Sequence, residues 1–239
     1  MINILKQLVP YKIKRKIKEN LGVPSLHWSL EHLKKKGFNP EMIIDVGAYK
    51  GNWTMDVLEV FPSSKILMVD AQRKMESYLQ ELCSKHKNVE YIISLLSSRD
   101  GDEKLFNINE TASYVATVPQ EGFDFETIKS QTLDKVIHER NLPFPDFLKL
   151  DVQGHELEIL RGAQKALANA EICLLEVSLL NVGDDGPLLI DVLRFMDENN
   201  FQAYDICQFM RRPYDNALYQ IDLFFAKKVS RIITEKRWN

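Results

Sequence analysis

Short apolar runs alternate along the chain with segments whose apolar residues recur every three or four positions. The runs predict strands near residues 42–46, 65–70, 89–94, 147–151, 171–177, 201–206 and 219–227. The segments with the helical period predict helices near residues 52–61, 72–86, 131–140, 155–168 and 187–199. Residues 100–125 break the rhythm with a turn signal and weak alternation, so we expect a short hairpin or an active-site loop there. Outside these residues, the alternation of strands and helices is typical of an α/β protein whose mostly parallel sheet is covered by helices on both faces.

The amino-terminal part has a different pattern. A helix is predicted over residues 11–21, between Pro10 and Gly22, and a second helix from Ser25 as N-cap to Lys36. These boundaries divide the chain into a helical arm of residues 1–40, an α/β domain of residues 41–229 and a tail of residues 230–239.

Charge separates the arm from the domain. Residues 1–36 carry nine Lys and Arg against two Glu, whereas the remaining residues carry 22 Lys and Arg against 32 Asp and Glu. In the helix of residues 11–21, Ile13, Ile17 and Leu21 form a narrow apolar stripe among basic residues. Such a helix can lie on an anionic membrane surface or meet an acidic partner, or it can dock its stripe on the domain.

The most informative loop runs from Asp45 to Gly51 and reads Asp-Val-Gly-Ala-Tyr-Lys-Gly. It links the strand of residues 42–46 to the helix of residues 52–61, so it lies at the carboxyl edge of the sheet, where such folds bind ligands. The backbone N–H groups at the start of the helix favour an anionic group of the ligand. Its two glycines are spaced as G-x-x-x-G, which differs from the G-x-G-x-x-G of a dinucleotide-binding loop.

A second acid ends the next strand. Asp70 lies 19 residues after Gly51 and follows the apolar run Ile66 to Val69. A carboxylate in this place accepts hydrogen bonds from two neighbouring ribose hydroxyls. Nucleotide-type cofactors of several kinds share this contact, so Asp70 by itself does not separate them.

The other dense motif begins at Phe147 and reads Phe-Leu-Lys-Leu-Asp-Val-Gln-Gly-His-Glu. An apolar strand delivers Asp151 at its carboxyl end, Gly154 turns the chain, and Glu156 opens a helix where its charge suits the dipole. With the Leu-Arg-Gly-Ala run at residues 160–163, this stretch closely resembles the signature of the FkbM family of methyltransferases. Further matches to that family are Thr132-Leu133-Asp134 and Leu175-Glu176-Val177, and the resemblance covers residues 42–227.

The resemblance implies a Rossmann-like sheet of seven strands with the last strand antiparallel. It also implies S-adenosylmethionine as cofactor and O-methylation, often of sugar hydroxyls in polysaccharides, glycolipids or secondary metabolites. Asp45 would lie near the amino group of the cofactor's methionine. The cofactor-binding residues expected on this basis are Asp45, Gly47, Ala48, Tyr49, Gly51, Asn52, Asp70, Ala71, Ser97 and Asp151.

The chain departs from the family pattern in three places. Tyr49 stands where Asn is usual, Val69-Asp70-Ala71 replaces the usual Phe-Glu-Pro, and Gln153 stands where Glu is common. The acid that ends the second strand is retained, so we expect these changes to affect the substrate more than the cofactor.

A hydroxyl acceptor must lose a proton, to a general base or with the help of a metal ion. His155 and Asp151 are the candidate catalytic residues, and His155 titrates near neutrality unless it is shifted. Alternatively, Asp151 and Glu176 offer hard oxygen ligands for magnesium.

Three other functions remain open. An NAD-dependent oxidoreductase of related fold is disfavoured by the missing third glycine and by the absence of a Tyr-x-x-x-Lys pair. A nucleic-acid methyltransferase is disfavoured because Asp151-Val152-Gln153-Gly154 occupies the place of the usual Asn/Asp-Pro-Pro-aromatic loop, so we expect no nucleic-acid partner. The third alternative is a non-catalytic module that binds S-adenosylmethionine but does not transfer its methyl group.

Composition limits the location. No apolar run approaches the ~20 residues that a spanning helix needs, and Lys6 and Pro10 interrupt any signal-peptide core. Cys83, Cys173 and Cys207 have no metal-binding spacing, which suits a reducing compartment. We expect a cytoplasmic protein that acts on a small molecule or glycan, with residues 1–22 as a candidate contact with the inner membrane surface. The pattern leaves the oligomeric state open.

Deletion of residues 1–22 tests the arm. Because the arm's charge contrasts with that of the domain, the deletion should leave cofactor affinity unchanged and reduce sedimentation with anionic vesicles at low salt. If the full-length chain does not sediment with such vesicles at low ionic strength, the arm has a structural role instead.

Overall fold

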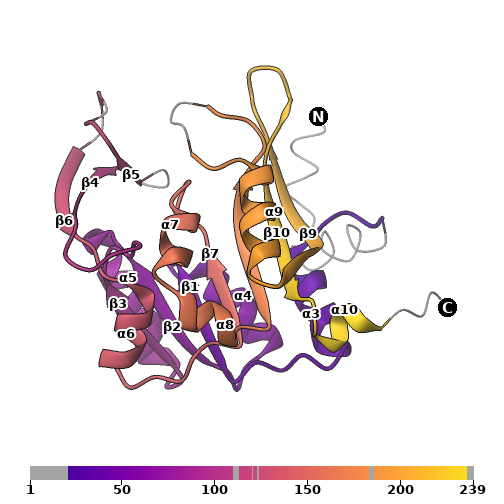
Figure 1. Ribbon diagram of the computed structural model, residues 1–239. Helices are drawn as coiled ribbons and strands as arrows, with labels where there is room; N and C mark the ends of the chain where they lie inside the picture. The colour runs from indigo at the N-terminus through magenta and orange to yellow at the C-terminus, as the bar shows by residue number, and fades with distance from the viewer. Residues whose placement is uncertain (1–20, 110–112, 120, 123, 183–185, 236–239) are drawn as a thin grey trace, which may run out of the picture.

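The computed structural model describes residues 21–235 except 110–112, 120, 123 and 183–185. Seven strands form the main sheet in the order β3-β2-β1-β7-β8-β10-β9 (Figure 1). Neighbours from β3 to β8 pair in parallel, and β10 is antiparallel to both β8 and β9. The bounds are β1 Met42–Val46, β2 Lys65–Asp70, β3 Val89–Ile93, β7 Phe147–Leu150, β8 Ile172–Ser178, β9 Phe201–Arg211 and β10 Leu218–Lys227. The predicted sheet with an antiparallel last strand is confirmed.

Helices cover both faces of this sheet because its central strands are apolar on both sides. One face is packed by α6 Leu133–Glu139, α7 Glu156–Arg161, α8 Gln164–Asn169 and α9 Leu189–Glu198. The other is packed by α3 Leu26–Lys35, α4 Asn52–Val60, α5 Glu76–Lys85 and α10 Arg231–Thr234, with the short 3₁₀ turn η1 Arg73–Met75 before α5. Strand β1 is buried along its whole length, so the loop after it begins from a fixed position.

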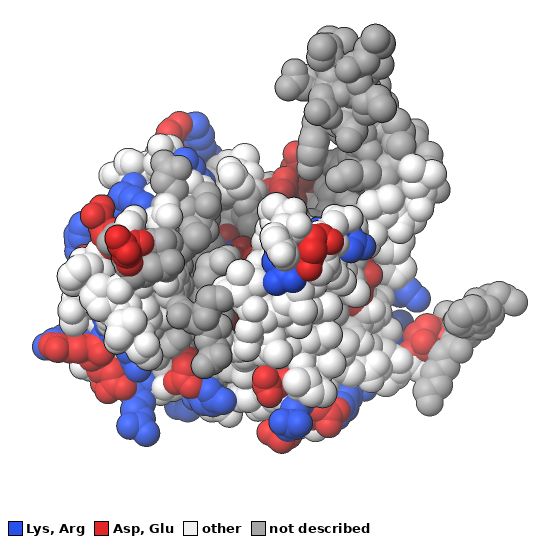
Figure 2. All heavy atoms as spheres, turned by 90° about the horizontal axis from the view of Figure 1, so that it is seen from above, with Lys and Arg blue, Asp and Glu red and all other residues white. Residues whose placement is uncertain are grey.

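A separate sheet of three strands lies above the carboxyl edge of the main sheet, at the upper left of Figure 1. Strand β4 Glu103–Ile108 pairs antiparallel with β5 Tyr114–Ala116 and with β6 Asp124–Lys129. These pairings agree with the hairpin expected within residues 100–125. Figure 2 looks down on the carboxyl edge and shows acidic and basic side chains interspersed over the described part of that face.

Several boundaries differ from prediction. The single helix predicted over residues 155–168 is two helices, α7 and α8, separated at Gly162. A Cβ at Gly162 would overlap the carbonyl group of Ser97, so the chain crosses the segment after β3 at this point. Strand β9 extends five residues beyond the predicted end at residue 206. The helix predicted over residues 11–21 falls almost wholly outside the described residues.

The part of the amino-terminal arm that is described belongs to the core of the domain. Helix α3 begins after Ser25 and buries Leu30 and Leu33 against the α4 side of the sheet. Among the described residues, no helix combines the length and the apolar character needed to cross a bilayer.

Candidate active site

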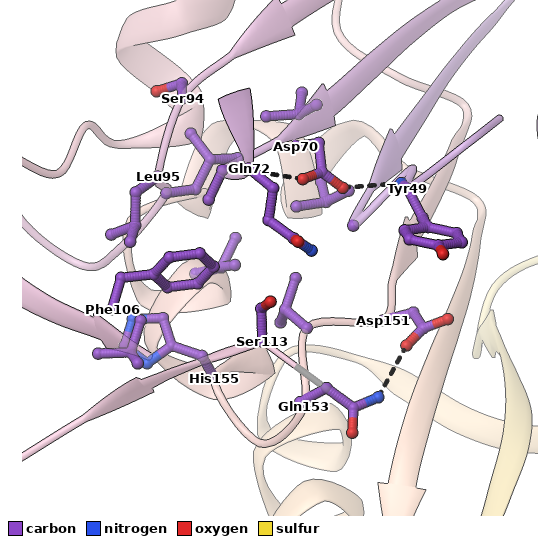
Figure 3. A pocket seen from close by; sticks show the side chains of 18 of the residues that line it. Tyr49, Asp70, Gln72, Ser94, Leu95, Phe106, Ser113, Asp151, Gln153 and His155 are labelled. Atoms are coloured by element: carbon purple, nitrogen blue, oxygen red, sulfur yellow. Dashed lines mark hydrogen bonds between the residues drawn. The ribbon is translucent and has the colours of Figure 1, made fainter. Parts of the chain in front are cut away.

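A cavity of about 240 Å³ lies at the carboxyl edge of β1, β2, β7 and β8 (Figure 3). The loops that follow these strands form its floor and sides, and the small sheet forms the wall opposite them. Its lining includes Gly47 and Tyr49 after β1, Asp70, Ala71 and Gln72 at the end of β2, Ser94, Leu95 and Leu96 after β3, Phe106, Ser113 and Val115 from the small sheet region, Asp151, Gln153 and His155 after β7, and Glu176 of β8.

Lys149 lies buried beneath this cavity, where β7 pairs with β1. Its Nζ lies 2.9 Å from Oδ1 of Asp45, the residue opposite it in register. The same Nζ donates hydrogen bonds to the carbonyl oxygens of Val46 at 3.3 Å and Gly47 at 3.0 Å. Burial disfavours the charge, but the carboxylates of Asp45 and Asp151 outweigh it and raise the pKa of Lys149 above its usual value. A charged Lys149 therefore holds the loop after β1 against β7.

Asp45 is fully buried, and its two carboxylate oxygens are occupied. Oδ1 faces Lys149, and Oδ2 accepts a hydrogen bond from Oγ1 of Thr54 at 2.8 Å. The Asp45 side chain does not line the cavity. The structure therefore gives Asp45 the role of an anchor for the loop and for α4, and its expected place near a bound methionine stays a prediction.

The loops after β1 and β7 touch each other. A Cβ at Gly47, whose φ is +75°, would overlap the carbonyl group of Asp151. Beyond that contact, Oε1 of Glu156 accepts hydrogen bonds from the backbone N–H groups of Val152 at 3.0 Å and Gly154 at 3.2 Å. Burial raises the pKa of Glu156 to about 7. Glu156 thus fixes the turn that follows Asp151.

Asp70 supports the loop after β1 from the other side. Its Oδ2 accepts a hydrogen bond from the N–H of Tyr49 at 2.7 Å, and its Oδ1 accepts one from the N–H of Gln72 at 2.8 Å. Tyr49 has a φ of +51°, and this hydrogen bond helps to hold that left-handed conformation. Burial raises the pKa of Asp70 above its usual value. Each carboxylate oxygen retains a second lone pair, so ligand hydroxyls can still donate to it.

A third group of polar side chains forms the wall near β8. Nε2 of Gln153 donates a hydrogen bond to Oε2 of Glu176 at 2.8 Å and lies 3.5 Å from Oδ1 of Asp151. Burial, with Asp151 and Glu156 adding to it, raises the pKa of Glu176 to about 9. One amide group thus lies between the two acids expected to bind magnesium. Within the described residues, no cluster of three or more His, Cys, Asp or Glu could hold a metal ion.

His155 lines the cavity from the start of α7. Its Nε2 lies 3.1 Å from Oγ of Ser97, which is fully buried. Burial lowers the pKa of His155 to about 4, with Glu158 opposing that shift. The ring is therefore neutral at physiological pH, and the expected titration near neutrality is corrected downward.

A known protein-family model matches the part of the chain that forms this cavity. The family model described as the methyltransferase FkbM domain matches residues 45–203, which include both loops and the cavity wall. The chain belongs to the FkbM methyltransferase family.

Relatives of this methyltransferase family member are distant. A segment of 82 residues is 34% identical to the hexuronic acid methyltransferase AglP of Haloferax volcanii, and it makes up 34% of each chain. A methyltransferase FkbM from Methylobacillus flagellatus KT has the same fold, with a TM-score of 0.51 and 17% identity over 77% of this chain and 43% of that one. Magnesium protoporphyrin IX methyltransferase of Synechocystis PCC 6803, solved with S-adenosylhomocysteine, has a TM-score of 0.50 and 12% identity over 84% and 80%. The chain thus spans about a third of the curated relative and less than half of the FkbM structure.

The structure brings together part of the expected site. The predicted residues that line the cavity are Gly47, Tyr49, Asp70, Ala71, Asp151, His155 and Glu176. Those that do not line it are Asp45, Ala48, Gly51, Asn52 and Ser97, of which Asn52 is exposed to solvent. Gly51 packs closely under the loop, since a Cβ there would lie 2.6 Å from Cδ1 of Leu82. Ser97 contacts the cavity lining through the hydrogen bond between its hydroxyl group and His155.

Sequence reasoning missed the wall formed by the small sheet and the side chain of Gln72. Phe106, Ser113 and Val115 come from the segment whose weak alternation showed a hairpin but not which face it turns inward. Gln72 lies two residues after Asp70, and that proximity to the acid predicted at the end of the second strand is the signal that could have found it.

A Gly47→Ala substitution should destabilise the protein, because it combines a left-handed backbone with an overlap against Asp151. We expect a loss of at least about 2 kcal/mol in the free energy of unfolding. Gly101→Ala is the matched control, since Gly101 has a φ of +79° but nothing within 4 Å of an added Cβ. Urea unfolding that gives equal losses for the two variants would contradict a close contact between the loops.

The position of Gln153 tests the magnesium hypothesis. Its amide already satisfies Glu176, so millimolar magnesium should leave the melting temperature of the wild type unchanged. Gln153→Glu would place a third carboxylate at the wall, and magnesium should then raise the melting temperature of the variant. If magnesium stabilises the wild type and Asp151→Asn abolishes that effect, the two acids do bind the metal.

Proposed function

We propose that this protein is an S-adenosylmethionine-dependent O-methyltransferase that acts on a sugar hydroxyl of a polysaccharide, glycolipid or secondary metabolite. Family membership and the fold support methyl transfer. The observation that carries the choice of cofactor is the chemistry of the cavity. The lining includes the acids Asp70, Asp151 and Glu176 together with His155, and the described lining contains no Lys or Arg.

This lining distinguishes between the two nucleotide cofactors considered. S-adenosylmethionine brings a sulfonium and an ammonium group, both of which are stabilised by nearby carboxylates. A nicotinamide dinucleotide would bring two phosphate charges into the same wall without a basic side chain to pair with them. The cavity therefore supports the methyl donor over the oxidoreductase alternative.

The residues of the cavity divide the work of holding this cofactor. Asp70 would accept hydrogen bonds from the ribose hydroxyls, while the loop at Gly47 and Tyr49 and the carboxylate of Asp151 would face the methionine end. The bound cofactor supplies a methyl group that is already strongly electrophilic. What remains for the protein is to align the acceptor oxygen and exclude water, and such positioning contributes up to ~7–11 kcal/mol in ideal cases.

The acceptor would lie between His155, Gln153 and the small sheet. A neutral hydroxyl suits this place better than a carboxylate, because the carboxylate of Asp151 would repel an anion and no basic side chain lines the described cavity. His155 is neutral and can accept the hydroxyl proton, although its low pKa makes it a weak base. The name of the AglP relative supports a sugar-type acceptor, and because a hexuronic acid is acidic, the choice between neutral and acidic sugars is left to experiment. A cytoplasmic site of action and a membrane contact through residues 1–22 are part of the same proposal.

Transfer of a labelled methyl group from S-adenosylmethionine to a panel of neutral and acidic sugars tests the proposal. Transfer to neutral sugars is the expected result. Binding of the cofactor without transfer to any acceptor would favour the non-catalytic module, and binding of NADH instead would favour the oxidoreductase.

Asp70→Ala should weaken S-adenosylmethionine binding about tenfold or more, because charge-assisted hydrogen bonds contribute about 1.5–3 kcal/mol each. The same substitution removes the acceptor for the N–H groups of Tyr49 and Gln72, so a loosened loop would contribute to the loss. Asp70→Asn keeps the shape but only one acceptor oxygen for these two N–H groups, so the melting temperatures of both variants are compared with wild type to measure how far the loop itself is loosened. Unchanged affinity of Asp70→Ala in calorimetry would remove Asp70 from the cofactor site.

If His155 takes the acceptor proton, His155→Ala should lower turnover by ~10²–10⁴-fold with little change in cofactor affinity. Because burial lowers its pKa to about 4, the wild-type rate should stay level from about pH 6 to 8 and fall only in more acidic solution. His138→Ala, on the exposed side of α6, is the control. A pH profile that rises through about 6.5 would contradict the buried environment assigned to His155.

The lowered pKa also gives a check that needs no substrate. The unfolded chain binds a proton at His155 near its ordinary pKa of 6.5, whereas the folded chain does so only near 4. The neutral, buried His155 therefore costs the folded state no stability above about pH 6.5. As pH falls from about 6.5 toward 4, protonation of the unfolded chain lowers the free energy of unfolding. Unfolding of His155→Gln should show a weaker loss of stability over this interval.

A further inference from the structure

Gln72 has a buried amide group that the protein leaves partly unpaired. Its side chain lines the cavity and is only 8% exposed, yet its Oε1 has no hydrogen-bond partner. A buried amide oxygen normally finds a donor, because losing water without compensation is unfavourable. Figure 3 shows the Gln72 side chain pointing into the cavity rather than toward the wall. The missing donor is therefore expected on a ligand.

The backbone fixes where this amide group lies. The N–H of Gln72 donates to Oδ1 of Asp70 at 2.8 Å, so the residue that would bind ribose hydroxyls also holds Gln72 in place. The end of β2 and the η1 turn flank the pair on either side. A ligand whose ribose meets Asp70 would thus present the group next to its ribose to Gln72.

The surroundings of the amide group suit a flat apolar ring. Leu95 and Phe106 lie beside it on the cavity wall, as Figure 3 shows. A purine base offers an apolar face to such side chains and a polar edge to an amide. Adenine in particular displays an amino donor next to a ring-nitrogen acceptor, and the Gln amide complements both.

We propose that Gln72 reads the adenine edge of the cofactor, with Oε1 accepting a hydrogen bond from the 6-amino group and Nε2 donating to a ring nitrogen. This assignment rests on the proposed function and adds to it a residue that selects adenine over other bases. Asp70 and Gln72, two residues apart, then recognise the ribose and the base of the same nucleoside.

The test compares two ligands that differ at a single position of the base. Calorimetry of the full chain measures S-adenosylhomocysteine against S-inosylhomocysteine, in which an oxo group replaces the 6-amino group. The wild type should bind the adenosyl compound about tenfold or more tightly, the effect of losing one buried hydrogen bond and leaving Oε1 against another acceptor. In Gln72→Met, adenosyl binding should weaken about tenfold while inosyl binding changes little.

Gln164→Met is the matched control, because Gln164 is exposed on α8 and its Nε2 donates to the carbonyl oxygen of Leu160. It should bind both ligands like the wild type. Equal affinity of the wild type for the two ligands overturns the inference, and this outcome needs no variant to fold. An equal loss for both ligands in Gln72→Met also overturns it, since Gln72 would then support the cavity or the acceptor. Failure of the wild type to bind S-adenosylhomocysteine or S-adenosylmethionine would instead refute the proposed function itself.

Discussion

A single buried ammonium group sits at the centre of the site. Lys149 lies on β7, faces Asp45 on the neighbouring strand and donates to two carbonyl oxygens of the loop that follows β1. Removing either charge would leave the other buried without its closest opposite charge, which is far more unfavourable than the pair itself is favourable. The loop of the first motif is therefore fixed to the strand of the second motif. The contacts that the loops after β1 and β7 make around the cavity depend on these two segments keeping their relative positions.

The contacts above this ion pair are close and mostly made by the backbone. Gly47 lies against the carbonyl group of Asp151 with no room for a side chain, and Glu156 ties down the turn beyond it. On the opposite side Asp70 accepts the N–H of Tyr49. Acids thus hold the loops by accepting backbone hydrogen bonds, and their burial raises the pKa of Glu156 and Asp70. Asp70 both supports a loop and lines the cavity, so a substitution there alters the loop as well as the cavity.

Sequence periodicity was enough to predict the parallel sheet, because each buried strand is a continuous apolar run. It also placed Asp70 at the end of β2 and Asp151 directly after β7, since strand ends follow directly from the runs. His155 begins α7 as expected, whereas Glu176 lies inside β8, two residues before the strand ends. The role of Asp45 could not be predicted this way, because only the register shows that it faces Lys149.

Other features depend on contacts between segments that are distant in the sequence. The break at Gly162 and the hydrogen bond between Ser97 and His155 both arise where such segments meet. The inward face of the small sheet, with Phe106 and Val115, depends on how that sheet packs. Trp28 on α3 is exposed and stacks on His32, a contact that the sequence pattern does not show.

Burial also sets the charges that a ligand meets, and these differ from a simple count of acids. At neutral pH His155 is uncharged and Glu176, with a pKa of about 9, keeps its proton and receives the amide of Gln153. A cationic ligand near Glu176 would favour the ionised carboxylate and so lower its pKa, which means that the proton and the cation compete for one group. An anion has no such exchange available, because no Lys or Arg lines the described cavity and Lys149 is already engaged by Asp45 and two carbonyls. The wall near β8 can therefore accommodate either a positive group of the cofactor or a neutral hydroxyl, and this restriction follows from burial rather than from any one residue type.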